Sequence, residues 1–130
     1  MLNSLQNPLS LLGRALLALL FIPAGFGKIG GFAGAVGSAA AKGVPMPEVA
    51  IAIAIVVELG LGLLLLIGFQ TRWAALAIAF FTVVITFIFH PLSDPAQAQA
   101  FFKNIAVVGG LLTVAAWGAG AWSVDAKGGR

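Results

Sequence analysis

Glu58 is the only charged residue in a run of 21 residues, from Val49 to Phe69. A run of this length spans the hydrocarbon core of a bilayer as a helix. An unpaired carboxylate near the middle of such a helix costs about 2.5–3.5 kcal/mol on insertion scales. We therefore expect Glu58 to be paired, hydrogen-bonded or used in function, within a membrane protein that has an internal polar site.

The composition of the chain also indicates a membrane protein. Hydrophobic residues make up 61% of the sequence and charged residues 8%, whereas a soluble domain has about 25% charged residues. The net charge is +3, but the seven Lys and Arg residues are scattered singly, so we expect no nucleic-acid partner. Cysteine is absent and there is one histidine, so we predict no thiolate chemistry and no metal site.

Four apolar segments predict an all-α integral membrane protein. We expect spans near residues 9–28, 48–69, 73–90 and 95–122, in a single domain covering residues 1–130. The first segment also resembles the start of a signal peptide, and we interpret it as a retained span. Residues 29–47 are interrupted by glycines and predict a short interfacial or re-entrant helix. The short connections favour an antiparallel four-helix bundle, with the interfacial helix between spans one and two.

Turn signals set the ends of the spans. Pro47 suits the first turn of span two, and Glu48 complements the positive end of that helix. His90 precedes a proline and should end span three. Asp94, followed by a proline and by Gln97, is typical of a helix start.

Cation placement predicts the orientation of the bundle. Four spans place both termini on one side of the membrane. The cations divide four to three between the two sides, with Arg14, Arg72, Lys127 and Arg130 on the terminal side and Lys28, Lys42 and Lys103 on the other. This excess favours cytoplasmic termini.

Two interpretations of Glu58 remain open. Arg14 and Lys28 share one face of span one with Phe21 and Gly25, and each cation could simply anchor a membrane interface. Arg14 lies about 9 Å shallower than Glu58 by axial rise, so the two could form a structural ion pair. Alternatively, Glu58 is a functional carboxylate that carries a proton or contacts a polar ligand.

A second polar group is predicted at the non-cytoplasmic mouth of the bundle. Lys28, His90, Lys103 and Asn104 should arrive there from three spans. Two cations, an amide and an imidazole suit an anionic or carbonyl-bearing ligand, including a quinone head group, although a structural polar network fits the same residues. We take Glu58 and His90 as candidate catalytic residues, and Lys28, Lys103 and Asn104 as candidate substrate-binding residues.

From Leu12 to Asp125, the chain resembles the DoxX family of small four-span bacterial membrane proteins. Short motifs in a fixed order carry the resemblance: Leu12-Gly13-Arg14, Ala24-Gly25-Phe26-Gly27-Lys28, Lys42-Gly43-Val44-Pro45, Glu58-Leu59-Gly60, Thr71-Arg72, Phe89-His90, Asp94-Pro95, Phe102-Lys103-Asn104 and Gly120-Ala121-Trp122-Ser123-Val124-Asp125. The resemblance implies a multi-pass protein of the bacterial inner membrane, embedded in the lipid bilayer.

The resemblance further implies a redox-linked role, such as a quinone-linked subunit that oxidises thiosulfate or a membrane partner in oxidative-stress defence. In that role Lys28, His90 and Lys103 would attract the anion, and Glu58 would accept a proton as quinone is reduced. We expect no covalently bound cofactor, so a quinone and a soluble or membrane redox protein would carry the electrons. The alternatives are a carrier or channel for a small solute and a non-catalytic scaffold, either of which could form a homo-oligomer.

Overall fold

The computed structural model describes residues 2–127, and within that range it contains helices and no strand. Among these residues, four helical segments are long and apolar enough to cross a membrane. The first is α1 (Gln6–Gly30), which follows the short turn η1 (Leu2–Leu5). Span two consists of α3 (Pro47–Ile55), the π-helical segment η2 (Val56–Leu61) and α4 (Gly62–Ile67). Span three is α5 (Thr71–Phe89), and span four is η3 (Pro95–Gln97) with α6 (Ala98–Trp117).

The predicted fold class is confirmed, including the short helix between spans one and two. This helix is α2 (Phe32–Ala41), and it is too short to cross a bilayer. The predicted ends of span four are partly wrong, because α6 ends at Trp117 rather than near residue 122. Gly118 follows with φ at 86°, a left-handed conformation that glycine adopts readily, and the chain leaves the helix there.

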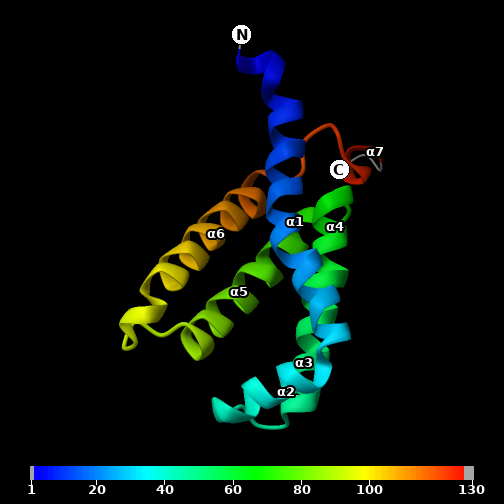
Figure 1. Ribbon diagram of the computed structural model, residues 1–130. Helices are drawn as coiled ribbons and strands as arrows, with labels where there is room; N and C mark the ends of the chain where they lie inside the picture. The colour runs from blue at the N-terminus through cyan, green and yellow to red at the C-terminus, as the bar shows by residue number, and fades with distance from the viewer. Residues whose placement is uncertain (1, 128–130) are drawn as a thin grey trace.

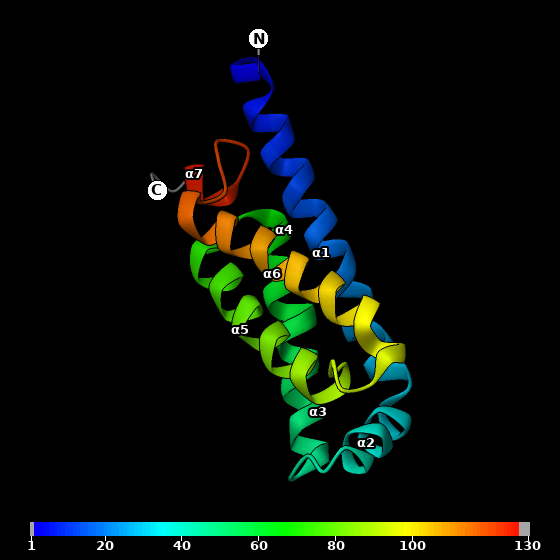
Figure 2. The same ribbon diagram turned by 90° about the vertical axis from the view of Figure 1, so that its left-hand side faces the viewer.

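The four spans pack in a ring around one apolar core. α1 packs on η2 and α4, α5 packs on α4 and most extensively on α6, and α6 returns to α1. Figures 1 and 2 show this arrangement from two sides. The core contains Phe21, Leu65, Ala75, Ile78, Ala79 and Leu111. Small side chains from α5 in this set let α5 approach its neighbours closely.

The two ends of the bundle differ in how tightly the helices meet. The first turn η1 and the tail after α6 lie at one end, which we call the terminal end, and α2 lies at the other, which we call the α2 end (Figure 1). Toward the α2 end, the α5–α6 pair swings away from α1 and α3 (Figure 1). α5 packs on η2 and α4, and α3 packs on α2, α1 and η2. The polar residues at the α2 end are therefore carried by two diverging helix pairs.

The tail after α6 closes the terminal end. Asp125 accepts hydrogen bonds from the backbone N–H groups of Gln70 (2.8 Å) and Thr71 (2.9 Å), and so caps the first turn of α5. Ser10 of α1 donates to the carbonyl oxygen of Ala119 at 2.9 Å. The short helix α7 (Val124–Lys127) completes the tail. Residues 118–127 thus hold α1, α4 and α5 together at this end.

Candidate functional site

Glu58 forms an ion pair with Lys28 inside the membrane span. Lys28 Nζ lies 2.8 Å from Glu58 Oε1, and the two side chains are 29% and 4% exposed. Glu58 is 11 residues from the start of its span and nine from the end, which is roughly 13–17 Å along the helix in each direction. Glu58 therefore lies near the middle of its span, where an unpaired charge would be most costly, and Lys28 supplies the opposite charge.

The face of α1 that carries Lys28 explains how the lysine reaches Glu58. Arg14, Ala18, Phe21 and Gly25 are the buried residues of α1, and their spacing of four and three continues to Lys28. Residues at this spacing lie along one side of a helix. This side of α1 packs on η2 and α4. Lys28 therefore points toward the helix that carries Glu58, and not toward lipid.

Glu58 lies within η2, a π-helical segment. A π-helical turn widens the backbone spiral by one residue and occurs frequently at functional sites. The backbone of α1 approaches this segment closely, because a Cβ atom added to Gly25 would lie 3.0 Å from both N and Cβ of Leu59. A Cβ atom added to Gly62 would lie 3.0 Å from Cγ1 of Ile22. Gly25 of α1 and Gly62 of α4 thus let span one and span two come near enough for the ion pair.

The predicted ion pair between Arg14 and Glu58 is wrong. The Arg14 guanidinium is 1% exposed and bonds three backbone carbonyls: Nη1 donates to Leu65 (3.0 Å) and Leu66 (2.9 Å), and Nη2 donates to Trp122 (2.6 Å). Two of these carbonyls belong to the last turn of α4, where backbone acceptors lack helical partners and favour a cation. Arg14 therefore fixes the terminal end, and Lys28 is left to pair with Glu58.

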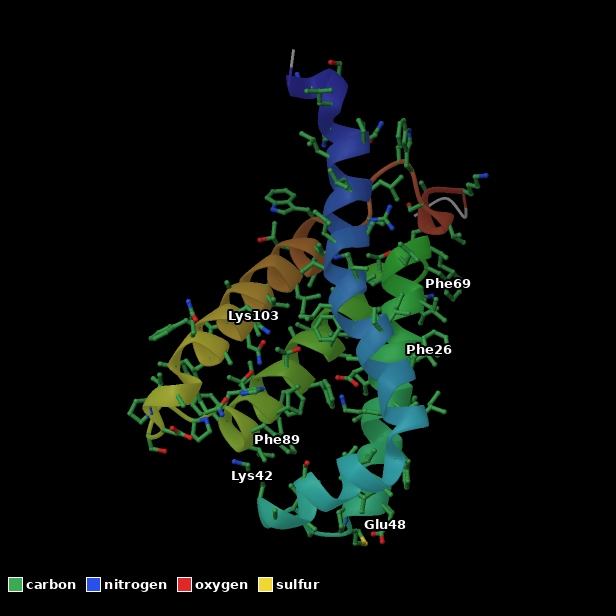
Figure 3. All side chains as sticks on the ribbon, in the orientation of Figure 1. Phe26, Lys42, Glu48, Phe69, Phe89 and Lys103 are labelled. Carbon is green, nitrogen blue, oxygen red and sulfur yellow. The ribbon has the colours of Figure 1, made fainter. Side chains whose placement is uncertain are left out.

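The structure separates the other residues of the predicted mouth. His90 follows α5, and its Nδ1 lies 2.6 Å from Oε1 of Gln97, so this ring nitrogen is engaged in the turn before α6. Lys103 is exposed on α6, whereas Asn104 beside it is buried at 8% exposure. Of the hydrogen bonds and ion pairs described for residues 2–127, none joins Lys28 to these three residues. Figure 3 shows Lys42 and Phe89 at the same end of the bundle.

Two of the three buried threonines of α5, Thr82 and Thr86, donate hydrogen bonds to the backbone of their own helix. Thr82 donates to the carbonyl oxygen of Ile78 at 2.8 Å, and Thr86 donates to that of Thr82 at 2.5 Å. Both side chains are almost fully buried, at 1% and 0% exposure. This local bonding is the expected behaviour of hydroxyls in membrane helices. It satisfies the hydroxyl hydrogens without a ligand.

The geometry of the ion pair defines what the site can do chemically. Lys28 is the more accessible partner, and its ammonium group can donate to an anion or a carbonyl oxygen while it still contacts Glu58. Apart from Lys28, the described residues give Glu58 Oε1 no hydrogen-bond donor. A carboxylate with one partner, next to a cation that a ligand can reach, is suited to accept or release a proton when the ligand engages the cation.

Sequence reasoning missed two parts of this arrangement. The first is η2, because no residue pattern in span two predicts a π-helical turn. The second is the capping of α5 by Asp125. The only signal in the sequence was weak: Gln70 is not among the residue types preferred before a helix. In the structure its side chain makes no capping bond, so the first N–H groups of α5 take an acceptor from the tail.

The buried ion pair and the four spans define a multi-pass integral membrane protein with an internal polar site. The family model named DoxX matches residues 9–91. The chain is 39% identical over 119 residues to inner membrane protein YqjF of Escherichia coli strain K12, covering 88% of each protein. It is 36% identical over 125 residues to inner membrane protein YphA of the same strain, covering 92% of this chain and 89% of YphA. No solved structure matches.

This chain belongs to the DoxX family. The match from residue 9 to residue 91 includes both members of the ion pair, Lys28 and Glu58, most of span one and the whole of spans two and three. Both relatives are named as inner membrane proteins, in agreement with the four apolar helices.

Proposed function

We propose that this protein is a redox-linked membrane subunit that binds a small carbonyl-bearing or anionic molecule, of the quinone or thiosulfate type, at the Lys28–Glu58 pair. The proposal rests on the pair itself, with its charges 2.8 Å apart and Glu58 near the middle of its apolar span. A pair of buried charges is weak evidence for stability, because apolar side chains of the same size would cost less. Charged residues at this depth instead favour a functional interpretation.

The proposed roles follow from accessibility. Lys28 donates a hydrogen bond to an oxygen of the ligand, because its half-buried side chain is the more accessible of the two. When the ligand is a quinone, Glu58 accepts a proton and passes it to the quinone oxygen as electrons arrive from a partner protein; thiosulfate would instead be the electron donor. His90 and Lys103 lie toward the α2 end, and we propose that they serve proton supply and attraction of an anion, respectively. Asn104 is the polar side chain of α6 that faces the bundle interior.

The fold favours access to this pair from the α2 end. Arg14 and the tail close the terminal end, whereas the helix pairs diverge toward α2 (Figure 1). We propose that the termini are cytoplasmic, so that the α2 end faces the other side of the inner membrane. The electrons then come from a soluble or membrane-bound redox partner.

The test compares two matched substitutions in membranes that contain the native partners. Glu58→Gln removes the buried charge with little change in size, and Glu48→Gln makes the same change in the first turn of α3, outside the pair. We expect quinone reduction to fall at least tenfold in Glu58→Gln and to stay near wild type in Glu48→Gln. Turnover that survives Glu58→Gln would remove this carboxylate from the mechanism.

A binding measurement on the purified chain separates this function from a scaffold role. A short-chain quinone that binds the folded protein should raise its melting temperature by mass action. We expect this increase in the wild type and its loss in Glu58→Gln. If the double variant Lys28→Met/Glu58→Leu keeps full activity in membranes, the pair only supports packing and the scaffold function is correct.

A further inference from the structure

Two hollows at the terminal end adjoin one another and differ in chemistry. The first, the tail hollow, has a volume of about 520 Å³ and lies between the first turn of α5 and the tail, lined by residues 70–73, 117–121, 125 and 126. The second, the membrane groove, has a volume of about 640 Å³ and runs between α1 and α6. Both are lined by Trp117 and Gly118, so they meet at the end of α6.

The membrane groove suits a hydrocarbon chain. Four leucines of α1 and two valines of α6 line it, namely Leu9, Leu16, Leu17, Leu20, Val107 and Val114. Gly13 and Gly110 also line the groove, and a Cβ atom added to Gly13 would meet nothing within 4 Å. Because these positions lack side chains, the groove stays open within the span, where lipid chains are the surrounding solvent.

The tail hollow suits an anionic head group. Arg72 lines it and is exposed, and among the contacts described for residues 2–127 its guanidinium donates through Nε to the carbonyl oxygen of Ala115 at 2.7 Å. The carboxylate in the same hollow, Asp125, is held by two backbone N–H groups at the positive end of α5. Trp73 and Trp117 flank the hollow and are 73% and 85% exposed. Tryptophan at this level of a membrane protein marks the interface where lipid head groups lie.

We infer that the terminal end carries a binding site for one anionic phospholipid of the surrounding bilayer, with an acyl chain in the membrane groove and the phosphate head group at Arg72 in the tail hollow. A second copy of the chain would occupy only the apolar membrane groove. An anionic amphiphile would occupy both hollows, because its apolar chain matches the groove and its charge is opposite to that of the cation in the tail hollow. The site is separate from the Lys28–Glu58 pair, because neither hollow includes those residues.

The three tryptophans of the chain provide the assay. Trp73 and Trp117 line the tail hollow, and Trp122 lies in the tail. Brominated phospholipids quench tryptophan fluorescence on contact, so the purified full chain is reconstituted in mixtures of phosphatidylglycerol and phosphatidylcholine, with one or the other lipid brominated. We expect brominated phosphatidylglycerol to compete about fivefold better at equal mole fraction, as attraction by one interfacial cation predicts.

Substitutions in the two hollows test whether this site causes the preference for phosphatidylglycerol. Arg72→Gln removes the cation and Gly13→Leu fills the groove, and each should reduce the preference to about one. Gly27→Leu is the control on the same helix, because Gly27 also faces open space and lines neither hollow. Helical content by circular dichroism shows that each variant is folded.

Three results would overturn the inference. The first is equal quenching by the two lipids in the wild type. The second is a preference for phosphatidylglycerol that survives both Arg72→Gln and Gly13→Leu. The third is protection of the tryptophans from both brominated lipids in a dimer, because a second copy would then fill the groove.

Discussion

Replacing Arg14 should detach the tail and destabilise the whole bundle. The guanidinium satisfies the carbonyl oxygens of Leu65, Leu66 and Trp122, and it is 1% exposed. Arg14→Met leaves one buried bond and two partly buried bonds without their donor, and each buried unsatisfied group costs about 1–3 kcal/mol. Three acceptors at the low end of that range give a loss of about 3 kcal/mol in the free energy of unfolding.

The assay is reversible unfolding in mixed micelles with increasing sodium dodecyl sulfate, followed by circular dichroism. Arg14→Lys should lie between the wild type and Arg14→Met, because an ammonium group keeps the charge but cannot reproduce the planar fork. Arg72→Met is the matched control, since it removes one exposed hydrogen bond to Ala115 and should cost less than about 1 kcal/mol. Equal losses for Arg14→Met and Arg72→Met would refute the assignment of Arg14 as the clamp of the terminal end.

Two further predictions concern the tail and the contact between α1 and η2. Asp125→Ala removes the cap from α5 and should lower the free energy of unfolding by about 1–2 kcal/mol, with faster proteolysis of residues 118–127 as the second readout; unchanged proteolysis would contradict the cap. Gly25→Ala places a Cβ atom 3.0 Å from the backbone N of Leu59 and should cost about 1–3 kcal/mol. Gly27→Ala, which meets nothing within 4 Å, should instead be neutral or stabilising by up to about 1 kcal/mol, and equal effects of the two changes would argue against close packing at Gly25.

The sequence predicted those features that local chemistry determines. Asp94 accepts a hydrogen bond from the backbone N–H of Ala96 at 3.0 Å, as expected of a residue that begins a helical segment. α5 ends at Phe89, directly before His90 and its following proline. These outcomes depend on a few neighbouring residues, whose steric and hydrogen-bonding preferences act over one turn.

The partner of Glu58 could not be chosen in this way. Arg14 and Lys28 lie on the same face of α1, and both are within reach of span two by axial rise. The choice between them depends on the tail, since the carbonyl of Trp122 and the end of α4 take up the Arg14 guanidinium. It also depends on η2, which sets the direction of the Glu58 side chain. Both are tertiary features that periodicity within one span does not encode.

A pair of double-mutant cycles tests the central assignment, that Glu58 is paired with Lys28 and not with Arg14. Unfolding free energies are measured for Lys28→Met, Arg14→Met and Glu58→Gln, and for the doubles that combine each cation change with Glu58→Gln. Removing either member of the buried pair should cost about 3–5 kcal/mol. The double variants show whether the losses of unfolding free energy from the two single substitutions are independent.

Because Lys28 and Glu58 are in contact, Lys28→Met/Glu58→Gln should lose at least about 1 kcal/mol less in unfolding free energy than the sum of its single variants. Arg14→Met/Glu58→Gln should be additive within about 0.5 kcal/mol. Coupling of Glu58 to Arg14, together with additivity for Lys28, would contradict the pairing of Glu58 with Lys28.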